Sequence, residues 1–270
     1  MAAELVSDIR VVTDEEVAHL RDHGWVKLEQ LIAAERVAQL LERAKGHMGS
    51  GGDQHAVRHG TDTGNVFWND RHNIADDDEA FASVCYGPQM GFNAQRFMRR
   101  DVGVLQTANM LAVKIGTKQG SSCPSTQPTP YHQDAMDVPI DRNGYVSFWI
   151  ALDHITVNMG GVRFVDRSHA LGMLGLVDLD ETYPELHDMT VTEVVELAPG
   201  DATVHTMYTI HGTDANETAS PRWALIVGYI PEDAMYTGGF AWSRATLAWR
   251  AAAELQSGDG FGAMLPKVYG

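Results

Sequence analysis

The spacing of apolar residues changes once along this chain of 270 residues, from a helical repeat to an alternating one. In the first hundred residues, apolar side chains such as Val37 and Leu40 recur every three or four positions, as they do along one face of an amphipathic helix. Thr13 and Glu16 form a capping box, which marks the start of a helix. We therefore predict a mainly helical N-terminal part over about residues 1–100.

Beyond Val102, apolar and polar residues alternate, which is typical of half-buried β-strands. Turn signals such as Pro199-Gly200 separate these stretches. We predict strands at residues 105–115, 145–152, 162–165, 192–197, 203–211 and 222–230. Helices followed by many short strands predict a mainly β fold with flanking helices, built as an antiparallel sandwich or barrel. No linker or internal repeat interrupts the pattern, so we expect one domain over residues 1–270.

Two segments lack a regular repeat and are candidates for the walls of a binding site. Residues 46–79 are rich in Gly, His, Asp and Asn, and a connection of this length is usually functional or disordered. We expect either a surface loop or a lid that uses Phe67, Trp68 and Asn69. Residues 176–192 are acidic and irregular, and form a second candidate for a variable rim.

The formal net charge of −16 argues against the function classes that need a basic surface. Nucleic acids and anionic membranes both bind to clusters of Lys and Arg. No apolar run approaches the ~18 residues of a membrane span, and no signal peptide is recognisable at the N-terminus. Cys85 and Cys123 lack the spacing of metal or redox motifs and indicate free thiols in a reducing compartment. We therefore expect a cytoplasmic protein with a small molecule as its partner.

His132 and Asp134 are the first candidates for chemistry. Two residues apart on an extended segment, their side chains leave the backbone on the same face. An imidazole and a carboxylate that converge in this way make up half of a site that can hold Fe(II) and leave positions open. The pair alone is weak evidence, because 12 His and 22 Asp in 270 residues give about one such pair by chance. A third ligand is needed.

The best third ligand is His211, at the end of the predicted strand 203–211. If this strand pairs with strand 222–230 as a hairpin, His211 and Arg222 become cross-strand neighbours. A metal ligand beside a guanidinium suits a dianion that chelates the metal with one end and carries a carboxylate at the other. The arginine can bind this distal carboxylate through two hydrogen bonds. Thr213 can add a hydroxyl to that carboxylate.

Two further polar residues, His205 and Lys114, each have two possible roles. His205 shares the face of His211 and is either a packed, hydrogen-bonded histidine or part of the site lining. Lys114 lies near the end of strand 105–115 and is either a solvated edge residue or a cation that points into the site and pairs with an anionic ligand. Local pattern does not separate these alternatives.

Together these motifs resemble the phytanoyl-CoA dioxygenase family of non-haem Fe(II)/2-oxoglutarate-dependent oxygenases. The resemblance covers roughly residues 100–231. The family's Pro-Gly-Ser-His turn is replaced here by Asp166-Arg167-Ser168-His169, which we interpret as structural. The matching motifs, in chain order, are His132-Gln133-Asp134, Ser147–His154, Gly160–His169, Gly200-Asp201, His211-Gly212-Thr213 and Pro221-Arg222.

The resemblance implies a double-stranded β-helix, or jelly-roll, core over about residues 101–231, followed by a C-terminal extension over residues 232–270. It implies Fe(II), 2-oxoglutarate and O2 as cofactors, with ascorbate as an optional reductant. The residues that match the family's site are the iron ligands His132, Asp134 and His211, the carboxylate-binding residues Arg222 and Thr213, and the aromatic neighbour Trp149.

The implied reaction is ferryl hydrogen abstraction from a small organic molecule, which in many bacterial relatives is a secondary metabolite. Hydroxylation, ring closure, epimerisation and desaturation are all compatible outcomes. The carboxylate of Asp134 argues against halogenation, because the related halogenases carry a small residue there. The alternatives are a cupin-type metal dioxygenase without a keto acid, which Arg222 and Thr213 disfavour, and a non-catalytic jelly-roll binding module, which the complete ligand set disfavours. The sequence leaves the oligomeric state open, with a homodimer as one alternative.

Overall fold

The computed structural model describes residues 8–54, 56–61, 64–116, 128–174, 183–239, 247–262 and 264–270, with backbone only for 56–61, 64–69, Ala248 and Trp249. Its helices include α1 (Asp14–His23), α2 (Ala34–Met48), α3 (Ile74–Asp77), α4 (Glu79–Cys85), α5 (Pro88–Met98) and α7 (Leu247–Glu254). Its strands are β1 (Trp25–Leu28), β2 (Ala56–Thr61), β3 (Gly64–His72), β4 (Val104–Lys114), β5 (Thr129–His132), β6 (Val146–Ala151), β7 (Val162–Phe164), β8 (Ala202–Thr206), β9 (His211–Thr213), β10 (Arg222–Pro231) and β11 (Lys267–Tyr269).

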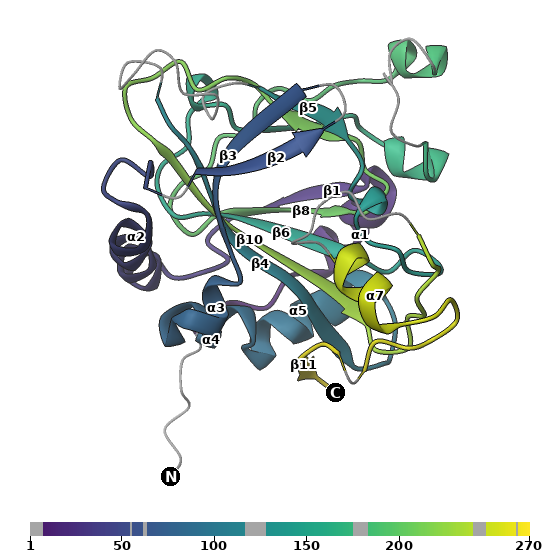
Figure 1. The fold of residues 1–270 in the computed structure, drawn as a ribbon. Coiled ribbons are helices and arrows are strands. Elements are labelled where there is room, and N and C mark those ends of the chain that lie inside the picture. Colours follow the sequence, from purple (N-terminus) through teal and green to yellow (C-terminus); the bar gives the residue numbers. More distant parts are fainter. Residues whose placement is uncertain are drawn as a thin grey trace.

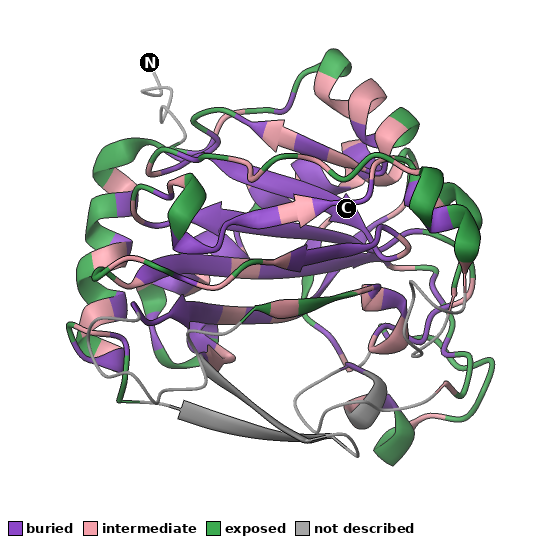
Figure 2. Ribbon diagram, turned by 90° about the horizontal axis from the view of Figure 1, so that it is seen from above, coloured by how far each residue is buried: buried purple, intermediate pink, exposed green. Residues whose placement is uncertain are grey.

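A large antiparallel sheet forms the centre of the molecule, with strand order β1-β8-β6-β10-β4-β3-β2 and with β11 paired to β4. Helices α3, α4 and α5 lie beneath this sheet in Figure 1, and Figure 2 shows that its central strands are largely buried. The alternation predicted at 145–152 explains this packing. Val146, Phe148 and Ile150 join the hydrophobic cluster between the sheet and the helices, whereas Trp149 belongs to a separate cluster on the opposite face.

A small antiparallel sheet, ordered β5-β9-β7, lies on the other side of the large sheet. In Figure 1 its strand β5 is above the large sheet, away from α3, α4 and α5. Two facing antiparallel sheets with helices on the outside confirm the predicted mainly β fold with flanking helices. The site residues lie between these two sheets.

The predicted strand at 203–211 is divided between the two sheets. β8 ends at Thr206 in the large sheet, the chain turns, and β9 begins at His211 in the small sheet. Thr209 holds the turn, because its hydroxyl donates to the carbonyl oxygen of Gly24 at 2.6 Å. The apolar alternation continues across the turn because both strands and the turn are buried, so the pattern alone does not reveal the break.

The predicted hairpin between strands 203–211 and 222–230 is therefore wrong. β10 pairs with β4 and β6, whereas β9 pairs with β5 and β7. Arg222 lies opposite Lys114 on β4 and not beside His211. Partners this far apart in sequence are chosen by the whole fold, and a local repeat carries no information about them.

Residues 46–79 do not form one long loop, so the predicted surface loop is wrong. After the end of α2, β2 and β3 form a hairpin, and β3 pairs in addition with β4 at the edge of the large sheet. Gly, Asn and Asp are rare in strands, so the local residue pattern here did not predict strands. The side chains of Phe67, Trp68 and Asn69 lie outside the described residues, so their predicted role as a wall stays a prediction.

The predicted strand at 192–197 is also wrong. The segment 192–197 forms no continuous strand, and Leu197 makes only an isolated bridge with Ile155. Pro184–Asp188 form a short 3-10 helix. Residues 175–182, which include the first seven of the seventeen residues of the predicted rim, lie outside the described residues.

Both ends of the chain contribute to the central sheet. The N-terminal part, which we predicted as mainly helical, supplies β1, β2 and β3. Beyond residue 231, β11 pairs with β4, and α7 packs through Leu247 and Ala251 on a second apolar cluster that includes Tyr145 and Phe261. Within the described part of the chain, every helix is too short or too polar to cross a bilayer.

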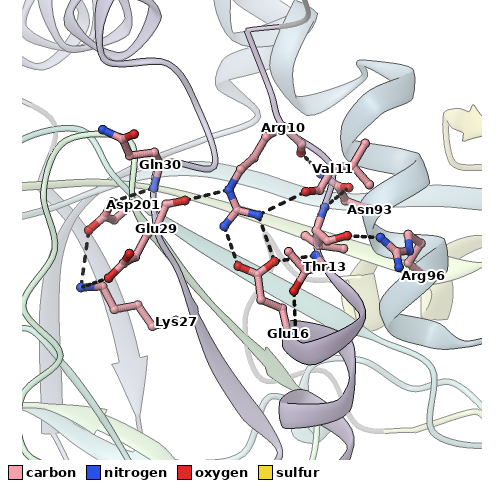
Figure 3. Close-up of polar contacts among 11 residues, drawn as sticks. Arg10, Val11, Thr13, Glu16, Lys27, Glu29, Gln30, Asn93, Arg96 and Asp201 are labelled. Carbon is pink, nitrogen blue, oxygen red and sulfur yellow. Dashed lines mark hydrogen bonds and ion pairs between the residues drawn. The ribbon is translucent and has the colours of Figure 1, made fainter.

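Asp201 connects the N-terminal segment to the start of β8, as Figure 3 shows. Its carboxylate accepts a hydrogen bond from the backbone N–H of Gln30 at 2.8 Å, and Lys27 Nζ lies 3.6 Å away (Figure 3). It also accepts from the backbone N–H of Ala198 at 3.0 Å. The preceding Gly200 has a φ of +91°, and a Cβ there would collide with a backbone carbonyl. The Gly200-Asp201 motif is therefore a structural anchor.

We predict that Asp201→Ala lowers the free energy of unfolding by about 1–3 kcal/mol, because two backbone N–H groups lose a charged acceptor. Denaturant unfolding followed by circular dichroism measures the change. Asp101→Ala, at an exposed carboxylate, serves as the control and should change the stability by less than ~0.5 kcal/mol. Equal stability of the two variants would contradict the anchoring role.

Candidate functional site

Three predicted ligands converge at the end of the small sheet. His132 ends β5, Asp134 begins the 3-10 helix that follows (Asp134–Met136), and His211 begins β9. The register of the small sheet places His132 directly opposite His211. One ligand atom from each of the three residues lies within 4.8 Å of the others. Among the described residues, this is the one cluster of His, Cys, Asp or Glu side chains with the geometry of a metal site.

Hydrogen bonds to the backbone orient both imidazoles. His132 Nδ1 lies 2.8 Å from the carbonyl oxygen of Pro130, and His211 Nδ1 lies 3.0 Å from that of Thr209. A carbonyl oxygen only accepts, so each Nδ1 carries the proton and each Nε2 keeps a free lone pair. Both Nε2 atoms lie 3.7 Å from Oδ1 of Asp134. Three donor atoms therefore face a common point before any metal binds.

The charge states suit this arrangement. Burial lowers the pKa of His211 well below its ordinary value, and the neighbouring His205 and His132 lower it further, so the imidazole is neutral. Burial on its own raises the pKa of Asp134, but His211, His205 and His132 hold it well below its usual range. A neutral imidazole and an ionised carboxylate are the forms that bind a divalent metal.

His205 lies directly beside the three ligands. It is 2% exposed, and its Nε2 lies 3.1 Å from Oδ2 of Asp134. Its ring centroid is 4.1 Å from that of His211. The two alternatives that the sequence left open for His205 therefore hold together, because the residue is packed, hydrogen-bonded and part of the site lining.

On the facing large sheet, Lys114 and Arg222 form a pair of buried basic side chains. They lie opposite each other in the β4–β10 register, and each is 5% exposed. Lys114 Nζ donates to Thr213 Oγ1 and, at 2.7 Å, to the carbonyl oxygen of Asp214. Lys114 thus points between the sheets, so the alternative of a solvated edge residue is wrong. Thr213, two residues after His211, links the ligand strand to this pair.

Arg222 is held in place by two neighbours. Its Nη1 donates to the carbonyl oxygen of Gly160 at 2.6 Å, and its guanidinium carbon lies 4.9 Å from the ring centroid of Trp149. Its Nε has no hydrogen-bond partner within the described residues. Gly160 adopts a φ of +67°, and a Cβ there would collide with the carbonyl of Asp214, so the tight turn at this glycine is what aims its carbonyl at the arginine.

The Lys114–Arg222 pair indicates a site for an anion. Burial and the charge of Arg222 lower the pKa of Lys114 to about 6, and burial lowers the pKa of Arg222 to about 10. At neutral pH the arginine is charged and the lysine is mostly neutral. Buried cations are normally paired with an anion, and an unpartnered guanidinium N–H is a donor that such an anion can use.

Tyr145 is a site residue that the sequence analysis did not single out. Burial raises the pKa of its hydroxyl well above the ordinary value, and the Asp134 carboxylate raises it further, so the phenol stays protonated beside the ligand. Gly228 makes room for the ring, because a Cβ there would lie 2.7 Å from Tyr145 Cε2. A sequence signal existed, since Tyr145 alternates with Ser147 and Trp149 on one face of the predicted strand.

Two relatives resemble this chain in sequence. A probable alpha-ketoglutarate-dependent hypophosphite dioxygenase from Stutzerimonas stutzeri is 23% identical over 231 residues, which are 79% of this chain and 77% of that protein. A methylphosphonate hydroxylase from Gimesia maris is 34% identical over 101 residues, which are 36% of this chain and 37% of that protein.

Solved structures share the fold. SnoK, a non-haem alpha ketoglutarate-dependent carbocyclase from nogalamycin biosynthesis, superposes with a TM-score of 0.74 at 21% identity, over 95% of this chain and 96% of its own. EctD from S. alaskensis, solved with 2-oxoglutarate and 5-hydroxyectoine, superposes with a TM-score of 0.72 at 19% identity, over 96% of this chain and 88% of its own. These likenesses confirm the predicted double-stranded β-helix core.

A family model agrees with the predicted resemblance. The model described as phytanoyl-CoA dioxygenase (PhyH) matches residues 20–224, a range that includes the three candidate ligands and the Lys114–Arg222 pair. The match, with the alpha-ketoglutarate-dependent relative, confirms the predicted enzyme class and its cofactors, iron and 2-oxoglutarate. The chain belongs to the phytanoyl-CoA dioxygenase family.

Proposed function

We propose that this enzyme oxidises a small organic molecule at an iron centre held by His132, Asp134 and His211. The observation that supports this most strongly is the position of the three converging ligand atoms beside the buried Lys114–Arg222 pair. A metal site next to a buried cation pair suits one bifunctional cosubstrate, which chelates the metal at one end and carries a carboxylate at the other.

The donor set suits Fe(II). Two imidazole Nε2 atoms and one carboxylate oxygen bind to one side of a metal ion and leave adjacent positions open, which is the arrangement of non-haem Fe(II) oxygenases. Oδ1 of Asp134 lies at the same distance from both Nε2 atoms, and both rings are already oriented by backbone carbonyls. His132, Asp134 and His211 therefore need little rearrangement to bind the ion.

2-Oxoglutarate suits the groups on the large sheet. Its distal carboxylate can accept a hydrogen bond from the unpartnered Nε of Arg222 and pair with Nζ of Lys114. We assign supporting roles to Thr213, which accepts from Lys114, and to Trp149, which lies against the guanidinium. Trp149 also packs in an apolar cluster, which keeps water away from the ion pair and strengthens it.

Bound iron and 2-oxoglutarate supply, with O2, an oxidant strong enough to remove hydrogen from an unactivated carbon. The residues of the chain bind and orient the reactants. Asp134 holds the ion as a carboxylate, the two histidines hold it as neutral ligands, and Arg222 fixes the far end of the cosubstrate. This orientation places the cosubstrate between the two sheets.

We infer a secondary metabolite as the substrate, because SnoK and the epimerase SnoN, both from nogalamycin biosynthesis, share this fold. A small phosphorus oxyacid is the second candidate, because both sequence relatives are named for such compounds. Succinate release that is stimulated by hypophosphite or methylphosphonate would favour the second candidate. The cytoplasmic location, the single-domain boundaries and the oligomeric state stay predictions.

We predict that Asp134→Ala abolishes iron-dependent turnover, because the metal loses its one anionic ligand. Two measurements check this: succinate release in the presence of Fe(II) and 2-oxoglutarate, and the anaerobic charge-transfer band near ~500 nm that such a chelate gives. Asp101→Ala, at an exposed carboxylate outside the site, should behave as the wild type. Wild-type turnover in Asp134→Ala would rule out the ligand assignment.

We predict that Arg222→Ala weakens 2-oxoglutarate binding by about 2–5 kcal/mol, because a buried carboxylate loses its charge-assisted partner. The apparent KM for 2-oxoglutarate and anaerobic titration of the charge-transfer band both report the change. Iron binding in the absence of the cosubstrate should stay close to that of the wild type. An unchanged KM would indicate that Lys114, and not Arg222, binds the distal carboxylate of 2-oxoglutarate.

We predict that 2-oxoglutarate binding takes up a proton near pH 7.5. The pKa of Lys114 is about 6 in the free site, so its amine is mostly neutral, and a bound carboxylate raises that pKa and protonates it. Isothermal titration calorimetry in buffers of different ionisation enthalpy should show uptake of up to about one proton per cosubstrate. Lys114→Met should remove the dependence of the binding enthalpy on the buffer. If the wild-type enzyme shows no such dependence, Lys114 is not the group that takes up the proton.

A further inference from the structure

The two carboxylate oxygens of Asp134 have different neighbours. Oδ1 lies 3.7 Å from His132 Nε2 and 3.7 Å from His211 Nε2, the two nitrogen atoms that face the metal position. Oδ2 lies 3.1 Å from Nε2 of His205. The geometry therefore separates an oxygen that faces the metal position from an oxygen that faces a fourth histidine.

His205 is confined to this contact by its surroundings. On β8 it pairs with Trp25 of β1 on one side and with Ser147 of β6 on the other. Its ring lies 5.7 Å from that of Phe164 and 4.1 Å from that of His211, measured between centroids. With 2% of its surface exposed, the ring has little room to turn away from the carboxylate.

The direction of the hydrogen bond follows from the charge of Asp134. An ionised carboxylate only accepts, so the proton lies on Nε2 of His205. The other nitrogen, Nδ1, is buried and has no hydrogen-bond partner within the described residues. An unpaired buried nitrogen costs free energy, and natural proteins retain such costs mainly at functional sites. The contact of Nε2 with Asp134 is the one hydrogen bond that the His205 side chain makes among the described residues.

We propose that His205 is a positioning residue, whose Nε2–H binds Oδ2 of Asp134 and so restricts this carboxylate to binding the metal through Oδ1 alone. The inference rests on the metal centre of the proposed function. A carboxylate that bound through both oxygens would occupy a further coordination position. Holding Oδ2 away leaves that position for the chelating cosubstrate or for O2. Partners of this kind typically contribute about 10–100-fold to metal affinity.

Two substitutions separate hydrogen bonding from packing. His205→Phe keeps a planar ring of similar size and removes the donor, whereas His205→Gln keeps an N–H donor on a flexible chain. His154→Phe, at a histidine outside the proposed site, is the matched control. The measurements are anaerobic Fe(II) and Co(II) affinity, the visible absorption spectrum of the Co(II)-substituted protein, which reports coordination number, and the thermal midpoint.

We expect His205→Phe to bind both metals about 10–100-fold more weakly and to change the Co(II) spectrum toward a higher coordination number. The metal affinity of His205→Gln should fall by less than about tenfold, and its Co(II) spectrum should stay that of the wild type. His154→Phe should match the wild type in both measurements. If His205→Phe does not fold, His205→Leu replaces it in the same comparison with His205→Gln.

Two results would overturn the proposal. One is wild-type affinity and spectrum in His205→Phe. The other is an equal loss in His205→Phe and His205→Gln, which would show that packing and not the donor matters. A wild-type protein that binds neither metal would instead disprove the proposed metal centre. Failure of the positioning role, with the wild type still binding metal, leaves the proposed function intact.

Discussion

The pairing of β5 with β9 is the interaction on which the candidate site depends. Its register places His132 opposite His211, although the two residues are far apart in sequence. The 3-10 helix after β5 then returns Asp134 toward both imidazoles. Sliding one strand by a single residue would turn a ligand to the other face of the sheet, so the register itself defines the metal position.

The distance between the two sheets is the second constraint. Lys114 on the large sheet bonds to Thr213 and to the Asp214 carbonyl, just after the last ligand of the small sheet. This contact connects the ligand strand to the strand pair that carries Arg222. Because both basic side chains are buried between the sheets, the charge of Arg222 acts at low effective dielectric. Its attraction for an anion is therefore stronger than it would be at the surface. Cosubstrate specificity and sheet packing therefore depend on the same contacts.

Periodicity predicted the class of fold, whereas the candidate ligands came from short motifs and the family resemblance. The alternation at 145–152 correctly predicted a strand whose faces differ, because Phe148 packs in the cluster with the helices and Trp149 in a separate cluster. It failed where apolar alternation continued through a buried turn, as at 203–211, and where polar and small residues formed strands, as at 46–79. In both cases pairing with a strand distant in the sequence, β9 with β5 and β3 with β4, outweighed local side-chain preference.

By itself the sequence determined which chemistry was available: a His-x-Asp pair, a third histidine, and an arginine and lysine at strand ends. Only the tertiary structure decided how these groups meet. It put His211 and Arg222 on facing sheets, turned Lys114 inward, and placed His205 against Oδ2 of Asp134. Residue types set what a group can bind, whereas strand register and sheet packing set the distances and the burial on which binding depends.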